Sequence, residues 1–141
     1  MPTVFTMIIN GDIPGRFVWK DDRCVAFLTI NPLRPGHTLV VPRDEVDHWL
    51  DLDADLLAHL STVSQSIGKA IQQAFQPKKV GLMIAGLEVP HVHMHLVPIV
   101  NEVQDLDFPN AEQKPDPDAL DQAAGAIRAA LRELGYQQVS D

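Results

Sequence analysis

Three histidines alternate with apolar residues in the segment HVHMHLV, which begins at His91. Successive side chains of a strand point to opposite faces of its sheet. The segment therefore predicts one face with His91, His93 and His95 and an opposite face with Val92, Met94 and Leu96. Histidine is a poor choice for a buried strand face, because every ring there needs a hydrogen-bond partner. The row indicates chemistry rather than core packing or three solvated rings.

Imidazoles in such a row support two kinds of chemistry. Histidines two positions apart on a strand can ligate one zinc or copper ion, and Glu88 and Glu102 lie near enough in sequence to support such a site. Without a metal, a neutral imidazole acts as a nucleophile or a general base, since its ordinary pKa of about 6.5 leaves most of it uncharged near pH 7. The residue types alone leave both possibilities open.

The strands that must position this row are expected from short apolar runs bounded by turn residues. The first two runs flank Asp21 and Asp22, a plausible turn pair, and predict a β-hairpin. The expected strands are Arg16–Lys20, Arg23–Leu28, His37–Val41, Val80–Ala85 and Pro90–Ile99.

Two helices are expected to cover the sheet. Between Asp53 and Phe75, apolar residues recur every three or four positions, which is typical of a helix with one buried side. A last helix is predicted from Pro117 to Leu134, with Asp116 as its N-cap, Gly135 just past its end and Leu134 in its buried stripe. The predicted class is α+β, with a five-stranded antiparallel sheet, one long helix packed on it and a C-terminal helix.

The length of 141 residues is typical of one domain. Residues 1–100 form its expected core, 101–116 a polar loop and 117–135 the last helix of the same domain. A net charge of −8 without a basic stripe argues against nucleic acid as a partner. No apolar run approaches the roughly 20 residues of a membrane helix, so no membrane partner is expected. The lone Cys24 cannot form an internal disulfide, and a cytoplasmic location is predicted.

The segment HVHMHLV resembles the His-x-His-x-His motif of the histidine triad (HIT) family of nucleotidyl hydrolases and transferases. The upstream stretch NGDIPGRFVWKDDRCVAFLTINPLRPGHTLVVPRDEVDH is similar to the N-terminal half of that family. The resemblance extends to about Ile99 and favours the bacterial nucleotide-binding branch. It implies a HIT-like fold and catalysis that needs neither a metal nor a cofactor.

The resemblance also implies a role for each of four histidines. His93 would attack the α-phosphorus of a nucleoside phosphoramidate or a dinucleoside polyphosphate and form a transient nucleotidyl-histidine. His95 would bond the phosphate oxygens and help to deliver a proton to the leaving group. His91 and His37 correspond to the pair that orients the nucleophile. The expected partners are a small nucleotide with a purine base and a second copy of the chain in a homodimer.

Six further residues are expected to bind the nucleotide, namely Phe27, Thr29, Ile30, Asn31, Glu88 and Val89. Thr29 stands where the family usually carries an acidic residue or asparagine for the ribose hydroxyls, and Asn31 lies two positions further on. Phe27 and Ile30 would form an apolar wall for the base. The backbone near Val89 would donate to the phosphate.

The chain departs from the family's pattern beside the phosphate and near the N-terminus. Leu87 and Glu88 replace a glutamine and a small hydroxyl residue. Thr3 and Thr6 replace the paired cysteines that hold a structural zinc in some members. Two alternatives therefore stay open, a nucleotide-binding regulatory protein with little turnover and a zinc-dependent hydrolase that uses the histidine row as ligands. His48 and His59 are assigned to the surface.

Overall fold

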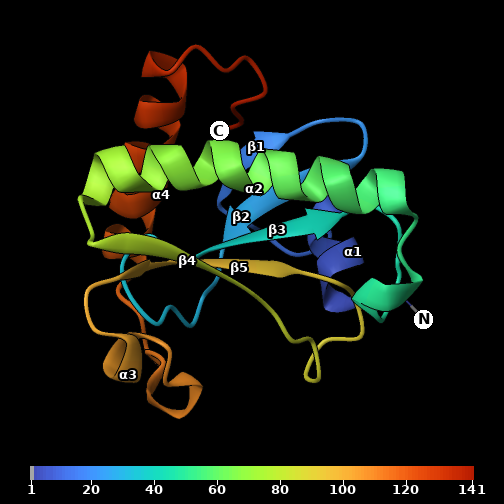
Figure 1. Cartoon of the computed structure of the whole chain (residues 1–141), viewed down its shortest axis with the longest axis horizontal. Coiled ribbons are helices and arrows are strands. Elements are labelled where there is room, and N and C mark those ends of the chain that lie inside the picture. Colours follow the sequence, from blue (N-terminus) through green and yellow to red (C-terminus); the bar gives the residue numbers. More distant parts are fainter. Residues whose placement is uncertain (1) are drawn as a thin grey trace.

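Residues 2–141, the part of the chain that the computed structural model describes, contain one five-stranded antiparallel sheet with the strand order β1-β2-β3-β5-β4 (Figure 1). The strands are β1 (Phe17–Lys20), β2 (Cys24–Leu28), β3 (Thr38–Pro42), β4 (Lys79–Ile84) and β5 (Met94–Ile99). The helices are α1 (Val4–Ile9), α2 (Ala54–Phe75), α3 (Glu102–Asp105) and α4 (Pro117–Glu133), with the single 3-10 turns η1 (Trp49–Asp51) and η2 (Phe108–Asn110). The predicted α+β class, its sheet and its two main helices are confirmed.

The long helix α2 runs across one face of the sheet and also packs on α4 (Figure 1). Its inward positions repeat every three or four residues, as the sequence predicted, and they are buried. These inward residues are Leu56, Leu60, Val63, Ile67 and Ile71. They form one core with Met94 and Leu96 of β5, with Val92 just before that strand, and with other residues that point to the same face.

Helix α4 begins as the sequence predicted. The Asp116 carboxylate accepts a hydrogen bond from the N–H of Asp118 at 3.1 Å, and Pro117 occupies the first turn. Gly135 follows the helix with a φ of +91°. The expected burial of Leu134 is wrong, because this residue is the C-cap and leaves 43% of its surface exposed.

The other face of the sheet is covered by α1, which no sequence pattern predicted. The Thr3 hydroxyl caps α1 by accepting from the N–H of Thr6 at 3.2 Å. Phe5 of α1 packs in a second buried cluster with Val25, Phe27, Leu39 and Val41. The part of this face around β2 and β3 is therefore shielded from water.

Two expected segments differ from the structure by more than one residue, whereas the bounds of the others agree to within one residue. The strand expected from Pro90 begins only at Met94, because the preceding backbone leaves the sheet and the N–H of Val92 bonds to the carbonyl of Val46 at 2.8 Å. The expected loop 101–116 contains α3 and η2, and the Asn101 side chain caps α3. Among residues 2–141, no helix is both long and apolar enough to cross a membrane.

Gly36 sits directly before His37 in a conformation that favours glycine. Its φ is +99°, and a Cβ atom at this position would lie 2.8 Å from Cε2 of Phe75 at the end of α2. A side chain here would meet both an unfavourable backbone conformation and a steric conflict.

We expect Gly36→Ala to lower the free energy of unfolding by roughly 2–5 kcal/mol, the sum of a left-handed backbone cost and an overpacking cost. Urea denaturation measures this loss. Gly86→Ala is the matched control, since Gly86 has a φ of +89° but no atom within 4 Å of the added Cβ. Only the backbone cost, about 1–2 kcal/mol, is expected there. Equal losses in the two variants would contradict the conflict with Phe75.

Candidate active site

The histidine row lies on the α1 face of the sheet, opposite the core that α2 covers. The imidazoles of His93 and His95 have centroids 4.8 Å apart, and those of His37 and His95 are 5.1 Å apart. His37, His91 and His93 are buried. The alternation in HVHMHLV therefore places the side chains on the two faces that it predicted, although His91 and His93 precede the hydrogen-bonded strand β5.

His91 is the deepest member and is held on both sides of its ring. Its Nε2 lies 2.7 Å from the carbonyl oxygen of Pro42, which only accepts, so Nε2 carries the proton. Its Nδ1 then accepts from the hydroxyl of Thr3 at 2.7 Å. The backbone N–H of Thr3 in turn donates to Oε1 of Glu45 at 2.6 Å. The N-terminal segment is thereby tied to the histidine row by hydrogen bonds.

His93 takes its tautomer from the backbone of His91. Nδ1 of His93 lies 2.8 Å from the carbonyl oxygen of His91, and this contact requires the proton to be on Nδ1. The Nε2 of the neutral ring is therefore left with a free lone pair. Phe5 packs edge-on against the same ring at a centroid distance of 4.9 Å, which limits its rotation. A neutral, oriented imidazole with an unprotonated nitrogen is a nucleophile.

His95 has the opposite tautomer, which the loop before β3 imposes. The N–H of Leu33 donates to Nδ1 of His37 at 3.0 Å, so the proton of His37 is on Nε2. That nitrogen donates to Nδ1 of His95 at 2.9 Å, and the proton of His95 is consequently on its Nε2. His37 was expected to orient the nucleophile, but its ring contacts His95 instead of making a hydrogen bond to His93.

Burial keeps these rings uncharged. It lowers the pKa of His93, a shift that the hydrogen bond to the His91 carbonyl and, to a smaller extent, the charge of Glu88 oppose. Burial, with a smaller effect from His93, lowers the pKa of His95 to about 4. Burial, with smaller effects from His95 and His93, lowers the pKa of His37 to about 3. The site thus presents a neutral nucleophile beside a neutral N–H donor at pH 7.

The six expected nucleotide-binding residues differ in how deeply they are buried and in what their side chains contact. Phe27 is buried on the histidine face, since it pairs with Leu39 of β3, which pairs with His95 of β5. Thr29 is half-buried, and its hydroxyl accepts from the N–H of Asn31 at 3.2 Å. The Asn31 side chain donates to the carbonyl of Glu112 at 3.0 Å, which ties it to the chain's own backbone.

The other three expected nucleotide-binding residues, Ile30, Glu88 and Val89, are exposed or half-buried. Ile30 leaves 64% of its surface exposed, which does not suit a buried wall for a base. Glu88 is exposed and Val89 half-buried, both in the connection between β4 and the histidine row. The structure brings Phe108 to His95 with a centroid distance of 5.2 Å, a contact that sequence reasoning missed because nothing in the tail beyond Asn101 marks it.

A second group of metal-ligating residue types lies at the β1–β2 turn. Asp21, Cys24 and His59 each place one possible metal-ligand atom within 4.8 Å of the other two. The Asp21 carboxylate already accepts from the Trp19 indole and the backbone N–H groups of Arg23 and Cys24, and it lies 2.8 Å from Nε2 of His59. Burial raises the pKa of the Cys24 thiol, which disfavours the thiolate that a metal needs. Hydrogen bonding explains this group, and His59 is half-buried rather than on the surface.

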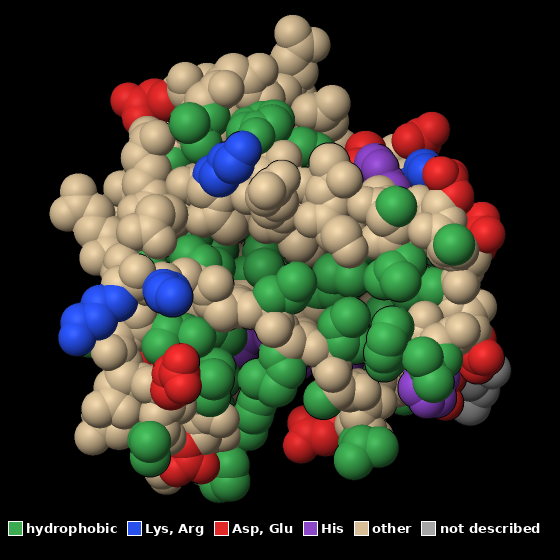
Figure 2. Space-filling model, in the orientation of Figure 1, with side chains coloured by type: hydrophobic (Ala, Val, Ile, Leu, Met, Phe, Trp, Pro, Cys, Tyr) green, Lys and Arg blue, Asp and Glu red, His purple; other side chains and the backbone are tan. Residues whose placement is uncertain are grey.

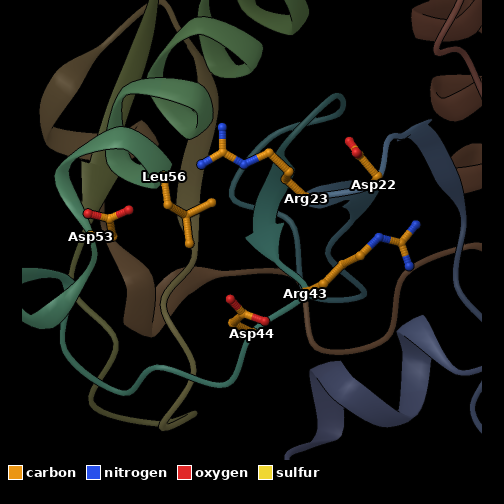
Figure 3. A pocket seen from close by; sticks show the side chains of 6 residues that line it. All are labelled: Asp22, Arg23, Arg43, Asp44, Asp53 and Leu56. Atoms are coloured by element: carbon orange, nitrogen blue, oxygen red, sulfur yellow. The ribbon is translucent and has the colours of Figure 1, made fainter.

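A small cavity of about 190 Å³ lies beside this turn, away from the histidine row (Figure 3). Arginine and aspartate side chains surround it in Figure 3. The lining residues are Asp22, Arg23, Arg43, Asp44, Asp53 and Leu56. The mixed charges suit neither an anion nor a cation alone, and the cavity contributes nothing to the histidine site.

Comparisons with known proteins agree with this geometry. The model of the HIT domain matches residues 10–102. An uncharacterized HIT-like protein of Saccharolobus solfataricus is 36% identical over 118 residues, covering 78% of this chain and 85% of the relative. A hypothetical histidine triad nucleotide-binding protein of Sulfolobus tokodaii has a crystal structure with a TM-score of 0.81 and 26% identity, covering 93% of each chain.

A zinc-bound histidine triad family protein of Mycobacterium smegmatis has a TM-score of 0.77 and 28% identity, covering 93% of this chain and 94% of that one. Both an archaeal and a bacterial protein thus share the fold of this chain. The match spans the hairpin, the PGH turn and the histidine row, and the chain belongs to the HIT family.

Proposed function

We propose that this protein is a nucleotidyl hydrolase that cleaves nucleotide conjugates at the α-phosphate through a covalent intermediate on His93. The observation that carries the proposal is the 2.8 Å hydrogen bond from Nδ1 of His93 to the carbonyl of His91, which leaves the lone pair of Nε2 free. The adjacent His95 carries its proton on the nitrogen that faces away from His37. A nucleophile and a donor of this kind are what a two-step displacement at phosphorus requires.

In the first step, Nε2 of His93 forms a bond to the α-phosphorus as the bond from phosphorus to the leaving atom breaks. The electron pair of that bond stays on the leaving atom. The negative charge of the bound phosphate raises the pKa values of His95 and His37, so that this pair takes up one proton from the solvent and His95 delivers it to the leaving atom. In the second step, water attacks the phosphorus, a proton returns to His95 and the bond to His93 breaks.

The expected substrate is a small nucleotide conjugate, a nucleoside phosphoramidate or a dinucleoside polyphosphate, with a purine base. Phe27 and Phe5 pack in the buried cluster on the histidine face with 3% and 7% of their surfaces exposed, so they support the site from behind and leave no free ring face for a base. Thr29 can make one hydrogen bond to a ribose hydroxyl if it releases Asn31. A free, buried Cys24 is compatible with a reducing compartment, and the proposal places the reaction in the cytoplasm.

The zinc-dependent alternative fits the histidine row less well. Both nitrogens of His91 already make hydrogen bonds, to Pro42 and to Thr3. One nitrogen of His93 bonds to the His91 carbonyl, and one nitrogen of His95 bonds to His37. Only Nε2 of His93 and Nε2 of His95 then remain, fewer than the three protein ligands of ordinary catalytic zinc sites. A nucleotide-binding protein with little turnover uses the same geometry and differs only in rate.

We also propose a homodimer that forms through β4. This strand is the free edge of the sheet next to β5, and Leu82 on it leaves 55% of its surface exposed. Figure 2 shows hydrophobic side chains gathered over the face that carries α2, β4 and β5. Edge strands and large apolar patches are common where two chains associate.

We expect the wild type to hydrolyse an adenosine phosphoramidate that carries a fluorescent amine, in the presence of a chelator. His93→Ala should lower kcat/KM by at least about 1,000-fold, because it removes the nucleophile. His48→Ala, at an exposed histidine, is the matched control and should retain full activity. Loss of wild-type activity on chelation would favour the zinc alternative. Tight binding of the nucleoside monophosphate without turnover would favour the regulatory one.

The dimer is tested with Leu82→Glu, which places a charge on the exposed edge of β4. Sedimentation should report a dimer for the wild type and a monomer for this variant, since a buried charge without a partner opposes association. Leu134→Glu, at the exposed end of α4, should remain a dimer. A wild type that sediments as a monomer at high concentration would refute the proposed interface.

A further inference from the structure

The N-terminal segment contacts the deepest ring of the histidine row. The hydroxyl of Thr3 donates to Nδ1 of His91 at 2.7 Å and accepts from the N–H of Thr6 at 3.2 Å. One side chain therefore both caps α1 and bonds to His91. Thr3 is half-buried, whereas His91 is fully buried. The hydroxyl thus satisfies a ring nitrogen that solvent does not reach.

The next turn of α1 adds an aromatic contact to the same rings. Phe5 packs edge-on against His91 at a centroid distance of 5.8 Å and against His93 at 4.9 Å. The helix has only six residues, far fewer than the roughly 12–15 that give an isolated helix marginal stability. Its position therefore depends on the cap and on these contacts.

The connection between β3 and α2 holds this segment from the other side. The carboxylate of Glu45 accepts from the N–H of Thr3 at 2.6 Å. Hydrogen bonds from Thr6 and Thr3 keep the pKa of Glu45 below its usual range, so Glu45 is a charged acceptor near pH 7. The carbonyl of the next residue, Val46, accepts from the N–H of Val92 at 2.8 Å. One short connection therefore anchors both α1 and the start of the histidine row.

These bonds converge on one peptide group. The N–H of Val92 and the carbonyl of His91 belong to the same planar unit. The backbone bond at Val92 holds one side of this unit, and the Thr3 hydroxyl holds the ring of His91. The carbonyl of the unit accepts from Nδ1 of His93 at 2.8 Å. A displaced His91 would therefore weaken the bond that orients His93.

We propose that Thr3 is a positioning residue for the nucleophile, because its hydroxyl fixes His91 and the His91 carbonyl in turn fixes His93. The inference rests on the proposed function, in which His93 attacks the phosphorus. Thr3 bonds to His91 and acts on His93 through it. The role therefore concerns the orientation of the attacking ring and not the binding of the nucleotide.

The residues at this point of the chain do not fit a structural zinc. Thr3 and Thr6 stand where some family members carry paired zinc cysteines. A threonine hydroxyl keeps its proton near pH 7, and it is not among the ordinary zinc ligands of proteins, which are cysteine, histidine and carboxylate groups. The lone pair on Nδ1 of His91 is already used by the Thr3 hydroxyl. A hydrogen bond, rather than a metal, therefore holds His91 here.

Steady-state hydrolysis of the fluorescent adenosine phosphoramidate tests this role. Thr3→Val keeps the shape of the side chain and removes the hydroxyl. We expect kcat to fall about 10- to 100-fold with KM unchanged, because the nucleophile is misplaced while the nucleotide contacts remain. Thr3→Ser keeps the hydroxyl and should retain a kcat near that of the wild type. Asp116→Ala, which removes the cap of a different helix, α4, is the matched control and should leave kcat unchanged.

Nitrogen NMR of the imidazoles at pH 7 gives a second measurement that does not depend on turnover. Wild-type His91 should carry its proton on Nε2 and none on Nδ1, since Nδ1 accepts from Thr3. In Thr3→Val, Nε2 of His93 should become partly protonated, because the bond that excludes this tautomer is weakened. Thr3→Ser should show the wild-type spectrum.

Four results would each overturn the positioning role. They are a proton on Nδ1 of wild-type His91, full kcat in Thr3→Val, an equal loss of kcat in Asp116→Ala, and a Thr3→Ser variant as slow as Thr3→Val. The first is read from the wild type and does not require Thr3→Val to fold. A wild type that hydrolyses no conjugate would refute the proposed function, and the spectra of His91 and His93 would then decide the role of Thr3 separately.

Discussion

The site depends on one hydrogen bond, from Nδ1 of His93 to the carbonyl of His91. A neutral imidazole carries one proton, and a carbonyl oxygen can only accept, so this bond decides which nitrogen of His93 has a free lone pair. The carbonyl must itself be fixed for this to work. The ring of His91 is held between Thr3 and Pro42, which come from the N-terminal segment and from β3.

A second chain of hydrogen bonds sets His95 in the opposite state. It starts at a backbone N–H, that of Leu33, and passes through His37 to His95. The turn that contains Gly36 brings the loop into this position. Two neighbouring imidazoles of the same type thereby acquire different roles, one as a nucleophile and one as a donor, because the His91 carbonyl holds Nδ1 of His93 and the His37 ring holds Nδ1 of His95.

Side-chain patterns predicted much of this arrangement. The apolar periodicity of α2, the caps of α4 and the alternation of HVHMHLV were sufficient for the sheet, its helices and the face of the histidines. The contacts that set the tautomers were not predictable, since backbone carbonyls and N–H groups have no sequence signature. Thr3 and His91 lie 88 positions apart. Phe108 was missed for the same reason, because only the hydrogen bonds of Asp105 with Val100 and of Glu112 with Asn31 bring it to His95.

The most direct test of the account is a nitrogen NMR titration of the imidazoles from pH 8 to pH 4, which reports the protonation state of each ring nitrogen. At pH 7 the account predicts a proton on Nδ1 and none on Nε2 for His93, and the reverse for His95. Burial lowers both pKa values, so both rings should stay neutral as the pH falls below 6.5, and His95 should protonate only near its pKa of about 4. A proton on Nε2 of His93 at pH 7, or titration of His93 above pH 6.5, would contradict the account.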